Sequence, residues 1–126
     1  SQATLILRGL TESMRANSNA QANYPDAIKA YVGVADPKAS PSCLNTACTS
    51  SDIAKYDAFM AAKSASGIGV KITMTECPGV KSVKRQCLFA AWDETYAKLS
   101  STDYSSCMDS NGIYAARAKC LMMEAY

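Results

Sequence analysis

Six cysteines constrain this chain more than any other feature, because its 126 residues contain no histidine at all. The cysteines are Cys43, Cys48, Cys77, Cys87, Cys107 and Cys120. Zinc sites combine cysteine with histidine or use cysteines separated by two residues, and no pair here has that spacing. The even number and loose spacing therefore predict three disulfides and no metal site. Because disulfides form in oxidising compartments, we expect an exported protein.

The remaining composition predicts one globular domain that spans residues 1–126. Hydrophobic residues make up 48% of the chain and charged residues 19%, which is typical of a folded protein of this length. The net charge of +2 is too small to indicate a general attraction to nucleic acid. An α+β fold follows from the patterns below, in which helical periods come first and strand periods last.

An amphipathic helix is predicted from Ser1 to about Asn17. Apolar residues recur there at spacings of three and four, and they form a face that is expected to pack on the core or on a neighbouring subunit. The residues of this face are Ala3, Ile6, Leu7, Leu10 and Met14. No secretion signal and no apolar run long enough to span a bilayer is visible. We therefore expect that a targeting segment upstream has been removed and that this helix once continued into a membrane.

Residues 20–50 are predicted to form a long, irregular connection. Proline, glycine and small polar residues interrupt it, with one turn of helix expected at residues 27–34. A loop of this length is uncommon inside a compact domain unless it is tied down, and a Cys43–Cys48 bridge would do so.

A short helix is expected next, with Ser50 or Ser51 as its N-cap and its end near Lys63. Its apolar face is predicted to be core. The residues of this face are Ile53, Tyr56, Phe59 and Met60.

The period changes to two after residue 70, which predicts an antiparallel sheet. One half-buried strand covers residues 70–75, a second covers 86–93, and a Cys77–Cys87 bridge would close the hairpin between them. Residues 116–124 are predicted to be the third strand, after a tight turn at Asn111-Gly112. A Cys107–Cys120 bridge would fasten this strand to the preceding loop. Six cysteines allow 15 pairings, and proximity in sequence is the basis for these three.

Catalytic, metal and cofactor sites are not expected. Without histidine the chain has no Ser-His or Cys-His arrangement, although a Ser-Lys pair such as Lys63-Ser64 stays open. Asp93 and Glu94 would point to opposite faces of a strand, so they make a poor acid–base pair.

A small basic cluster on the hairpin loop is the one candidate for weak contact with nucleic acid. Its residues are Lys81, Lys84 and Arg85, and Arg117 and Lys119 are expected on the last strand. A groove that follows phosphates needs more charge than this, so a solvated loop is the favoured interpretation and nucleic acid is not expected as a partner.

Several local motifs point to one known family. The segment from Leu10 to Asn17 reads L-T-E-S-M-R-A-N, Tyr24 follows it, and Ala54-Lys55-Tyr56-Asp57 comes after the Cys43 and Cys48 pair. The segment Phe89-Ala90-Ala91-Trp92 reads as a strand that ends in tryptophan. Together they resemble the E-x-M-R-A-N segment, cysteine pair, A-x-x-D helix and sheet strand of type IV pilus minor pilins, in particular the PilV type, also called type IV pilus modification proteins. Phe59 and Met60 stand where that family often has a tryptophan.

The resemblance implies a type IV pilin-like fold, in which a long helix packs on a short antiparallel sheet. Residues 1–19 would be the end of the long helix, 20–69 the connecting loop with its short helix, and 70–126 the sheet and C-terminal disulfide region. The resemblance also implies a structural role in assembly, with other minor pilins and the major pilin as partners. The helix would anchor the head on the periplasmic side of the inner membrane and later join a surface pilus that serves motility or adhesion.

A minor pilin in a priming or tip complex is therefore the leading hypothesis. Two alternatives stay open: a DNA-binding minor pilin of the uptake machinery, and a secreted disulfide-rich adhesin or binding module unrelated to pili.

Overall fold

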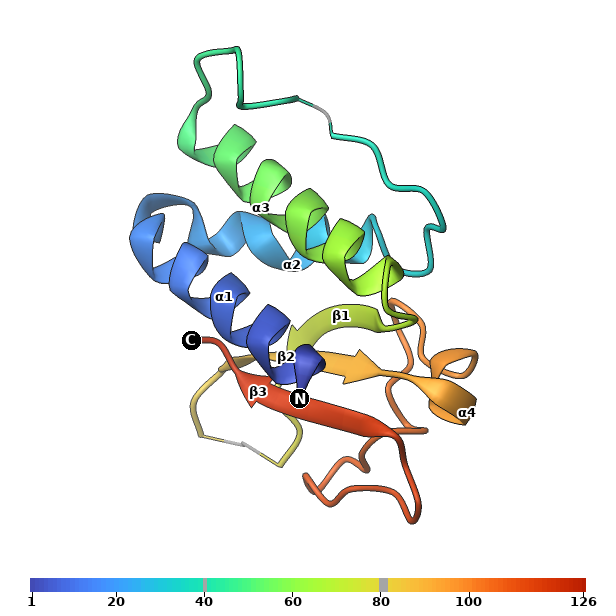
Figure 1. The fold of residues 1–126 in the computed structure, drawn as a ribbon. Helices are drawn as coiled ribbons and strands as arrows, with labels where there is room; N and C mark the ends of the chain where they lie inside the picture. The colour runs from blue at the N-terminus through green and yellow to red at the C-terminus, as the bar shows by residue number, and fades with distance from the viewer. Residues whose placement is uncertain (40, 80–81) are drawn as a thin grey trace.

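The computed structural model describes residues 1–39, 41–79 and 82–126. Three helical segments form one layer, and this layer lies over one face of a three-stranded antiparallel sheet with the order β1-β2-β3 (Figure 1). The elements are α1 (Gln2–Ala16), η1 (Ser18–Asn23), α2 (Tyr24–Lys29), α3 (Ser50–Ser66), β1 (Lys71–Glu76), β2 (Gln86–Ala91), α4 (Asp93–Tyr96) and β3 (Cys120–Glu124). The predicted α+β class is confirmed.

Helix α1 has the bounds that its apolar period predicts. The Ser1 hydroxyl accepts a hydrogen bond from the Thr4 amide at 3.3 Å and caps the first turn. At the other end, Asn17 donates its own amide to the carbonyl groups of Ser13 and Met14.

The connection after α1 is more helical than the sequence predicts. The chain continues directly into η1 and α2, and only residues 30–49 are irregular, with a few turns at their start. Pro25, which reads as an interruption, lies in the first turn of α2, where the missing amide of proline costs no hydrogen bond. The predicted helical turn at residues 27–34 was therefore placed too late.

Helix α3 begins at a different cap and is longer than predicted. Thr49, and neither Ser50 nor Ser51, is the N-cap: its hydroxyl accepts from the Asp52 amide at 3.1 Å. The Asp52 carboxylate accepts from the Thr49 amide in return, at 3.2 Å, which completes a capping box. The helix ends at Ser66, three residues beyond the predicted Lys63.

The buried face of α3 consists mainly of alanine, which corrects the predicted face. Of the predicted residues only Phe59 is buried, whereas Ile53 and Met60 are exposed and Tyr56 is half-buried. The core side carries small side chains instead: Ala54, Ala58 and Ala65. Because α3 packs against both α1 and α2, small side chains there let the helices approach closely. Ile53 and Met60 of α3 consequently face outward.

The central strand β2 contributes to two separate cores, because alternate side chains of a strand point to opposite faces. Leu88 and Ala90 pack under the helices. Phe89 points the other way, into a second core covered by the loops after β2, and its ring stacks on Tyr104 with centroids 4.8 Å apart. The sheet is thus buried on both faces, and Thr73 of β1, predicted to be half-exposed, is fully buried.

The end of the sheet also differs from prediction. Strand β2 stops at Ala91, and Asp93 and Glu94 lie in the short helix α4 and not on a strand. Strand β3 begins only at Cys120, so Arg117 and Lys119 precede it. Arg117 has φ +60°, a left-handed backbone conformation that interrupts extended structure.

Three disulfides join the cysteine pairs that neighbour each other in sequence, as predicted. The Cα–Cα distances are 5.8 Å for Cys43–Cys48, 4.9 Å for Cys77–Cys87 and 5.6 Å for Cys107–Cys120. The predicted turn at Asn111-Gly112 is present as well, with Gly112 at φ +83°. It lies against Gly79, where a Cβ atom would come within 2.7 Å of the Asn111 carbonyl oxygen.

Candidate assembly surface

A buried polar network joins the three helical segments. Tyr24, which is fully buried at the start of α2, donates its hydroxyl to the Asp57 carboxylate of α3 at 2.6 Å. Asn17, at the end of α1, donates its side-chain amide to the Tyr24 hydroxyl oxygen at 3.2 Å and to the Ser50 carbonyl at 2.9 Å. These hydrogen bonds thus link residues that are distant in sequence.

Burial controls the protonation of this network. It raises the pKa of the Tyr24 phenol far above its ordinary value, and the hydrogen bond to Asp57 adds to this effect, so the phenol remains a donor. Burial also raises the pKa of the Asp57 carboxyl above its usual range, and the hydrogen bond from Tyr24 offsets only part of that increase. Ionisation of Asp57 therefore lowers the stability of the fold.

Asp57→Asn is expected to remove a pH dependence of stability. An acid with a raised pKa in the folded state binds its proton more tightly there than in the unfolded chain. Stability is consequently highest below the unfolded value of about 4 and decreases as pH rises through the folded pKa. Asparagine keeps an oxygen acceptor for Tyr24 without the charge. Urea midpoints at acid and neutral pH should therefore differ less in the variant than in the native protein; equal differences would contradict this account.

Asp57 also lies at the base of a groove between α1 and α3. The groove has a volume of about 390 Å³ and is lined from α1 by Leu5, Ile6, Gly9, Leu10 and Ser13, and from α3 by Asp57, Met60, Ala61 and Ser64. Leu5 and Met60 form its apolar rim and are 66% and 46% exposed. Gly9 leaves the groove open, since an added Cβ atom would meet nothing within 4 Å. This arrangement suits another helix better than a small polar ligand.

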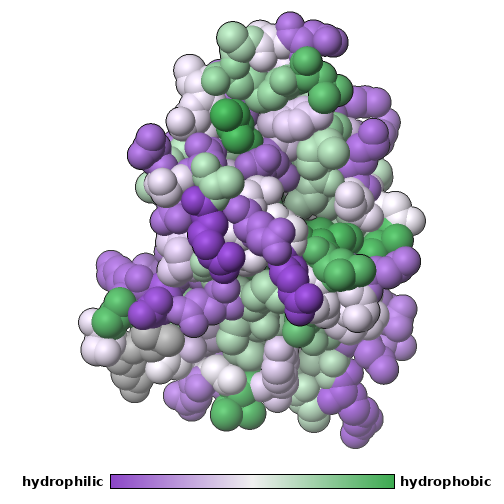
Figure 2. Space-filling view, turned by 60° about the vertical axis from the view of Figure 1, so that its left-hand side comes forward, coloured by the Kyte–Doolittle hydropathy of each residue, from purple (hydrophilic) through white to green (hydrophobic). Residues whose placement is uncertain are grey.

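Seen from the side on which α1 lies, the molecule shows hydrophobic areas separated by hydrophilic side chains (Figure 2). Single exposed apolar residues are common on protein surfaces and need no explanation. The α1–α3 groove differs because its exposed apolar residues come from two elements and face one hollow.

The N-terminal part of the chain matches a known family. Residues 1–59 match the family model described as Tt1218-like, Type IV pilin Tt1218. This part of the chain is similar to the type IV pilin family. The match includes α1, η1, α2 and the first part of α3, and thus all four residues of the polar network. Nothing among the curated proteins or the solved structures matches the chain significantly.

Two expectations agree with this similarity. Type IV pilins are structural subunits, which agrees with the prediction that the chain is no enzyme. The similarity also agrees with the expectation of assembly partners in a pilus. Among the described residues, no helix combines the length and apolar character needed to cross a bilayer.

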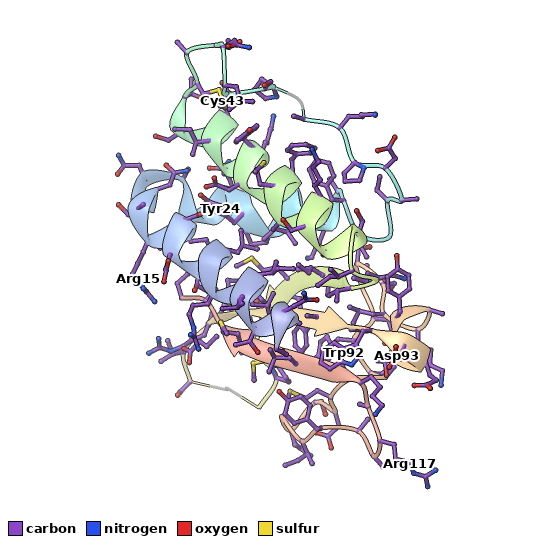
Figure 3. All side chains as sticks on the ribbon, viewed as in Figure 1. Arg15, Tyr24, Cys43, Trp92, Asp93 and Arg117 are labelled. Atoms are coloured by element: carbon purple, nitrogen blue, oxygen red, sulfur yellow. A yellow bond between two sulfur atoms is a disulfide. The ribbon has the colours of Figure 1, made fainter. Side chains whose placement is uncertain are left out.

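The motif residues that carried the resemblance have distinct places in the structure. Met14 and Ala54 are buried in the core, whereas Arg15 points into solvent (Figure 3). Asn17, Tyr24 and Asp57 meet in the polar network. All three are motif positions, but their contact with one another was not predicted. The available signal was Tyr24, because a buried tyrosine needs a partner for its hydroxyl.

The predicted α1 face divides between two surroundings. Ala3, Leu7, Leu10 and Met14 are buried in the core of the domain, while Ile6 is half-buried and borders the groove. The exposure of Leu5 and Met60 was not predicted. Leu5 falls outside the predicted stripe and repeats with Gly9 and Ser13 every four residues, which is the pattern of a second helical face.

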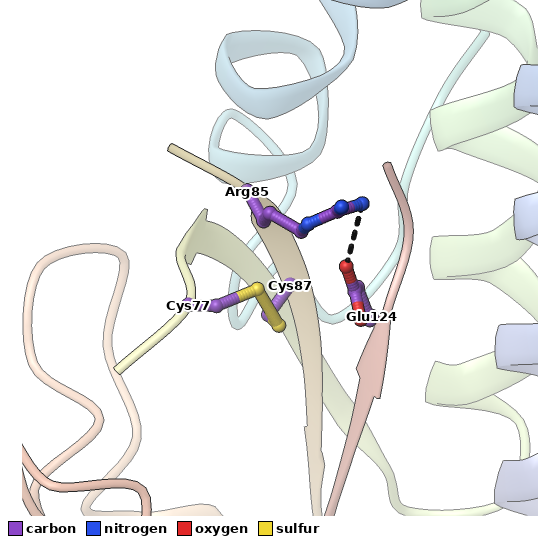
Figure 4. A network of polar contacts seen from close by, with 4 residues as sticks. All are labelled: Cys77, Arg85, Cys87 and Glu124. Atoms are coloured by element: carbon purple, nitrogen blue, oxygen red, sulfur yellow. Dashed lines mark ion pairs between the residues drawn. A yellow bond between two sulfur atoms is a disulfide. The ribbon is translucent and has the colours of Figure 1, made fainter. Parts of the chain in front are cut away.

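Two residues of the basic cluster that was considered for weak contact with nucleic acid lie beside carboxylates. Arg85 pairs with Glu124 of β3 at 3.1 Å, beside the Cys77–Cys87 bridge (Figure 4). Lys84 lies 3.9 Å from the Glu76 carboxylate. Lys81 lies outside the described residues. Since two cations of the cluster face carboxylates of the same sheet, the cluster offers little net charge to a phosphate backbone.

Proposed function

We propose that this chain is the head of a structural minor pilin of the PilV type, which joins other pilins through the groove between α1 and α3. Its partners would be other minor pilins and the major pilin in a complex that primes assembly or remains at the tip. Before assembly the head would lie in the periplasm, anchored to the inner membrane through an upstream part of the α1 helix; afterwards it would belong to the surface pilus.

The groove is the observation that supports this proposal. One face of α1 is already buried in the head, yet Leu5 remains exposed on the other side of the same helix. Gly9 and Ser13 follow Leu5 at intervals of four, and small residues at this spacing let a second helix backbone come close. A subunit built only to fold would have no need of an apolar rim on both sides of an open groove.

Leu5→Asp in the full-length protein is expected to weaken association with the pilins encoded beside it by at least about 30-fold, the loss typical of an apolar hot spot. Co-purification from detergent-solubilised membranes measures this association, and pili per cell give a second readout. Ile113→Asp is the matched control, because Ile113 is 63% exposed but lies on a loop remote in sequence from both helices of the groove.

Unchanged association of the Leu5→Asp protein would reject the groove as the contact. Absence of any pilin among the co-purified proteins would reject the pilin role itself, and would favour an independent secreted adhesin or binding module.

A further inference from the structure

A second hollow, of about 710 Å³, lies between α4 and the segment that precedes β3. Its lining residues are Glu94, Thr95, Lys98, Ser106, Ala115, Ala116, Arg117, Ala118 and Lys119. Arg117 marks its location at the end of the molecule opposite Cys43 (Figure 3). Arg117 and Lys119 were expected on the last strand, and a basic surface at this place was not predicted.

The cations of this basic hollow are not neutralised by ion pairs among the described residues. Lys98, Arg117 and Lys119 form no ion pair with any carboxylate of the described residues. Glu94 is the acid that lines the hollow with them. Lys84 and Arg85 of the hairpin, by contrast, face carboxylates directly. Three cations against one carboxylate make a concave, positively charged surface.

The backbone holds two of these cations in place. The amide of Lys119 donates to the Thr95 hydroxyl at 2.9 Å, and its carbonyl accepts from the Trp92 amide at 3.0 Å. Arg117 is the third residue of the turn closed by the Ala118 amide and the Ala115 carbonyl at 3.1 Å. That position with φ +60° ordinarily favours glycine or asparagine. The chain therefore carries a long cationic side chain where glycine would be less strained.

The basic hollow lies close to the start of α1. Ser1 and Trp92 line one shallow depression, and Trp92 is hydrogen-bonded to Lys119. In Figures 1 and 3, the N-terminal end of α1 points toward the same end of the molecule as Arg117. If α1 continues upstream into a membrane, as the proposed function holds, the hollow faces the bilayer at the point where the helix enters it.

We propose that the basic hollow binds the phosphodiester headgroups of an anionic phospholipid bilayer, and so orients the head on the membrane before assembly. This inference rests on the proposed function, which places a membrane at the upstream end of α1. Basic residues beside an anionic surface are attracted electrostatically, and the attraction falls off within a Debye length. Three cations on a single face close to the membrane anchor satisfy this requirement without a deep binding pocket.

Co-sedimentation of the 126-residue protein with lipid vesicles at about 50 mM salt tests this inference. Vesicles with about 30% phosphatidylglycerol should bind it and pure phosphatidylcholine vesicles should not. The triple variant Lys98→Ala, Arg117→Gly, Lys119→Ala should bind the anionic vesicles roughly 100-fold more weakly, at about fivefold per charge. Glycine at position 117 also relieves the strained turn, so poor folding should not explain the loss.

A matched variant removes three exposed charges elsewhere: Arg15→Ala, Lys55→Ala and Lys63→Ala. It has the same net charge as the triple variant, but it should keep most of the vesicle binding of the native protein. Glu94→Gln should bind about fivefold more tightly, since it removes the acid from the hollow.

Equal binding to neutral vesicles, or equal losses in the two triple variants, would overturn the inference. Displacement by millimolar inorganic phosphate would overturn it in favour of a free-anion site, and tighter binding to duplex DNA would overturn it in favour of nucleic acid. None of these results would affect the Leu5→Asp association test, so this inference and the pilin role can fail separately.

Discussion

Leu10→Asp combined with Met14→Asp is expected to leave the domain unfolded at room temperature. Both side chains are buried in the apolar core beneath α1. An uncompensated carboxylate in such a site costs several kcal/mol, and two of them should exceed the stability of about 5–15 kcal/mol typical of a domain. Circular dichroism and urea titration of the 126-residue protein measure the loss.

Leu5→Asp provides the control on the same helix. Leu5 is 66% exposed, so the same chemical change should alter the free energy of unfolding by no more than about 0.5 kcal/mol. A cooperative, native-like urea transition of the Leu10 and Met14 variant would mean that the register of α1 is wrong. The control also shows whether Leu5→Asp protein is folded when its association is tested.

Removal of the Cys107–Cys120 disulfide by paired alanine substitutions is expected to cost about 3 kcal/mol. Its two cysteines are 13 residues apart. Crosslinking a loop of this length removes conformational entropy from the unfolded chain, and this stabilises the fold by about 3 kcal/mol. Cys107 is also fully buried in the second core, next to Phe89 and Met108. Urea unfolding of the variant under otherwise equal conditions measures the difference.

The Cys43–Cys48 pair is the comparison for this experiment. Its bridge closes only five intervals and its cysteines are half-exposed, so its removal should cost less, at most about 2 kcal/mol. A larger loss for Cys43–Cys48 than for Cys107–Cys120 would contradict the role given to the second core.

Elements with strong local signals could be predicted from the sequence. Each of three patterns is typical of a single local structure: the three-and-four spacing of α1, the alternation in β1 and the Asn111-Gly112 pair. The structure has a helix, a strand and a turn at these places. The bounds of α3 and β3 were less accurate. Thr49 rather than a serine caps α3, and the left-handed backbone at Arg117 delays β3; both depend on surroundings that a local pattern does not contain.

The candidate surface was harder to predict, because it depends on how helices pack. A stripe of Ile53, Tyr56, Phe59 and Met60 is the obvious core face of α3, yet the close approach of three helices selects alanine for the inside. Met60 is thereby turned outward and meets Leu5 across the groove. The basic hollow likewise brings α4 and the β3 approach together, two segments about 20 residues apart in a region with little regular period.

Strand β2 contributes side chains to both cores, and this has a consequence for how the sequence of the protein can change in evolution. Family similarity ends within α3, and everything that covers the second face of the sheet comes from residues beyond that point. The loops over that face pack against the second core, which holds Phe89, Leu99 and Cys107. They can therefore be exchanged, lengthened or given new charges while Leu88 and Ala90 preserve the helix-facing core. Because the disulfides crosslink the loops on this side of the sheet, a changed loop would remain attached at both ends. The outer loops could thus evolve separately from the helical layer.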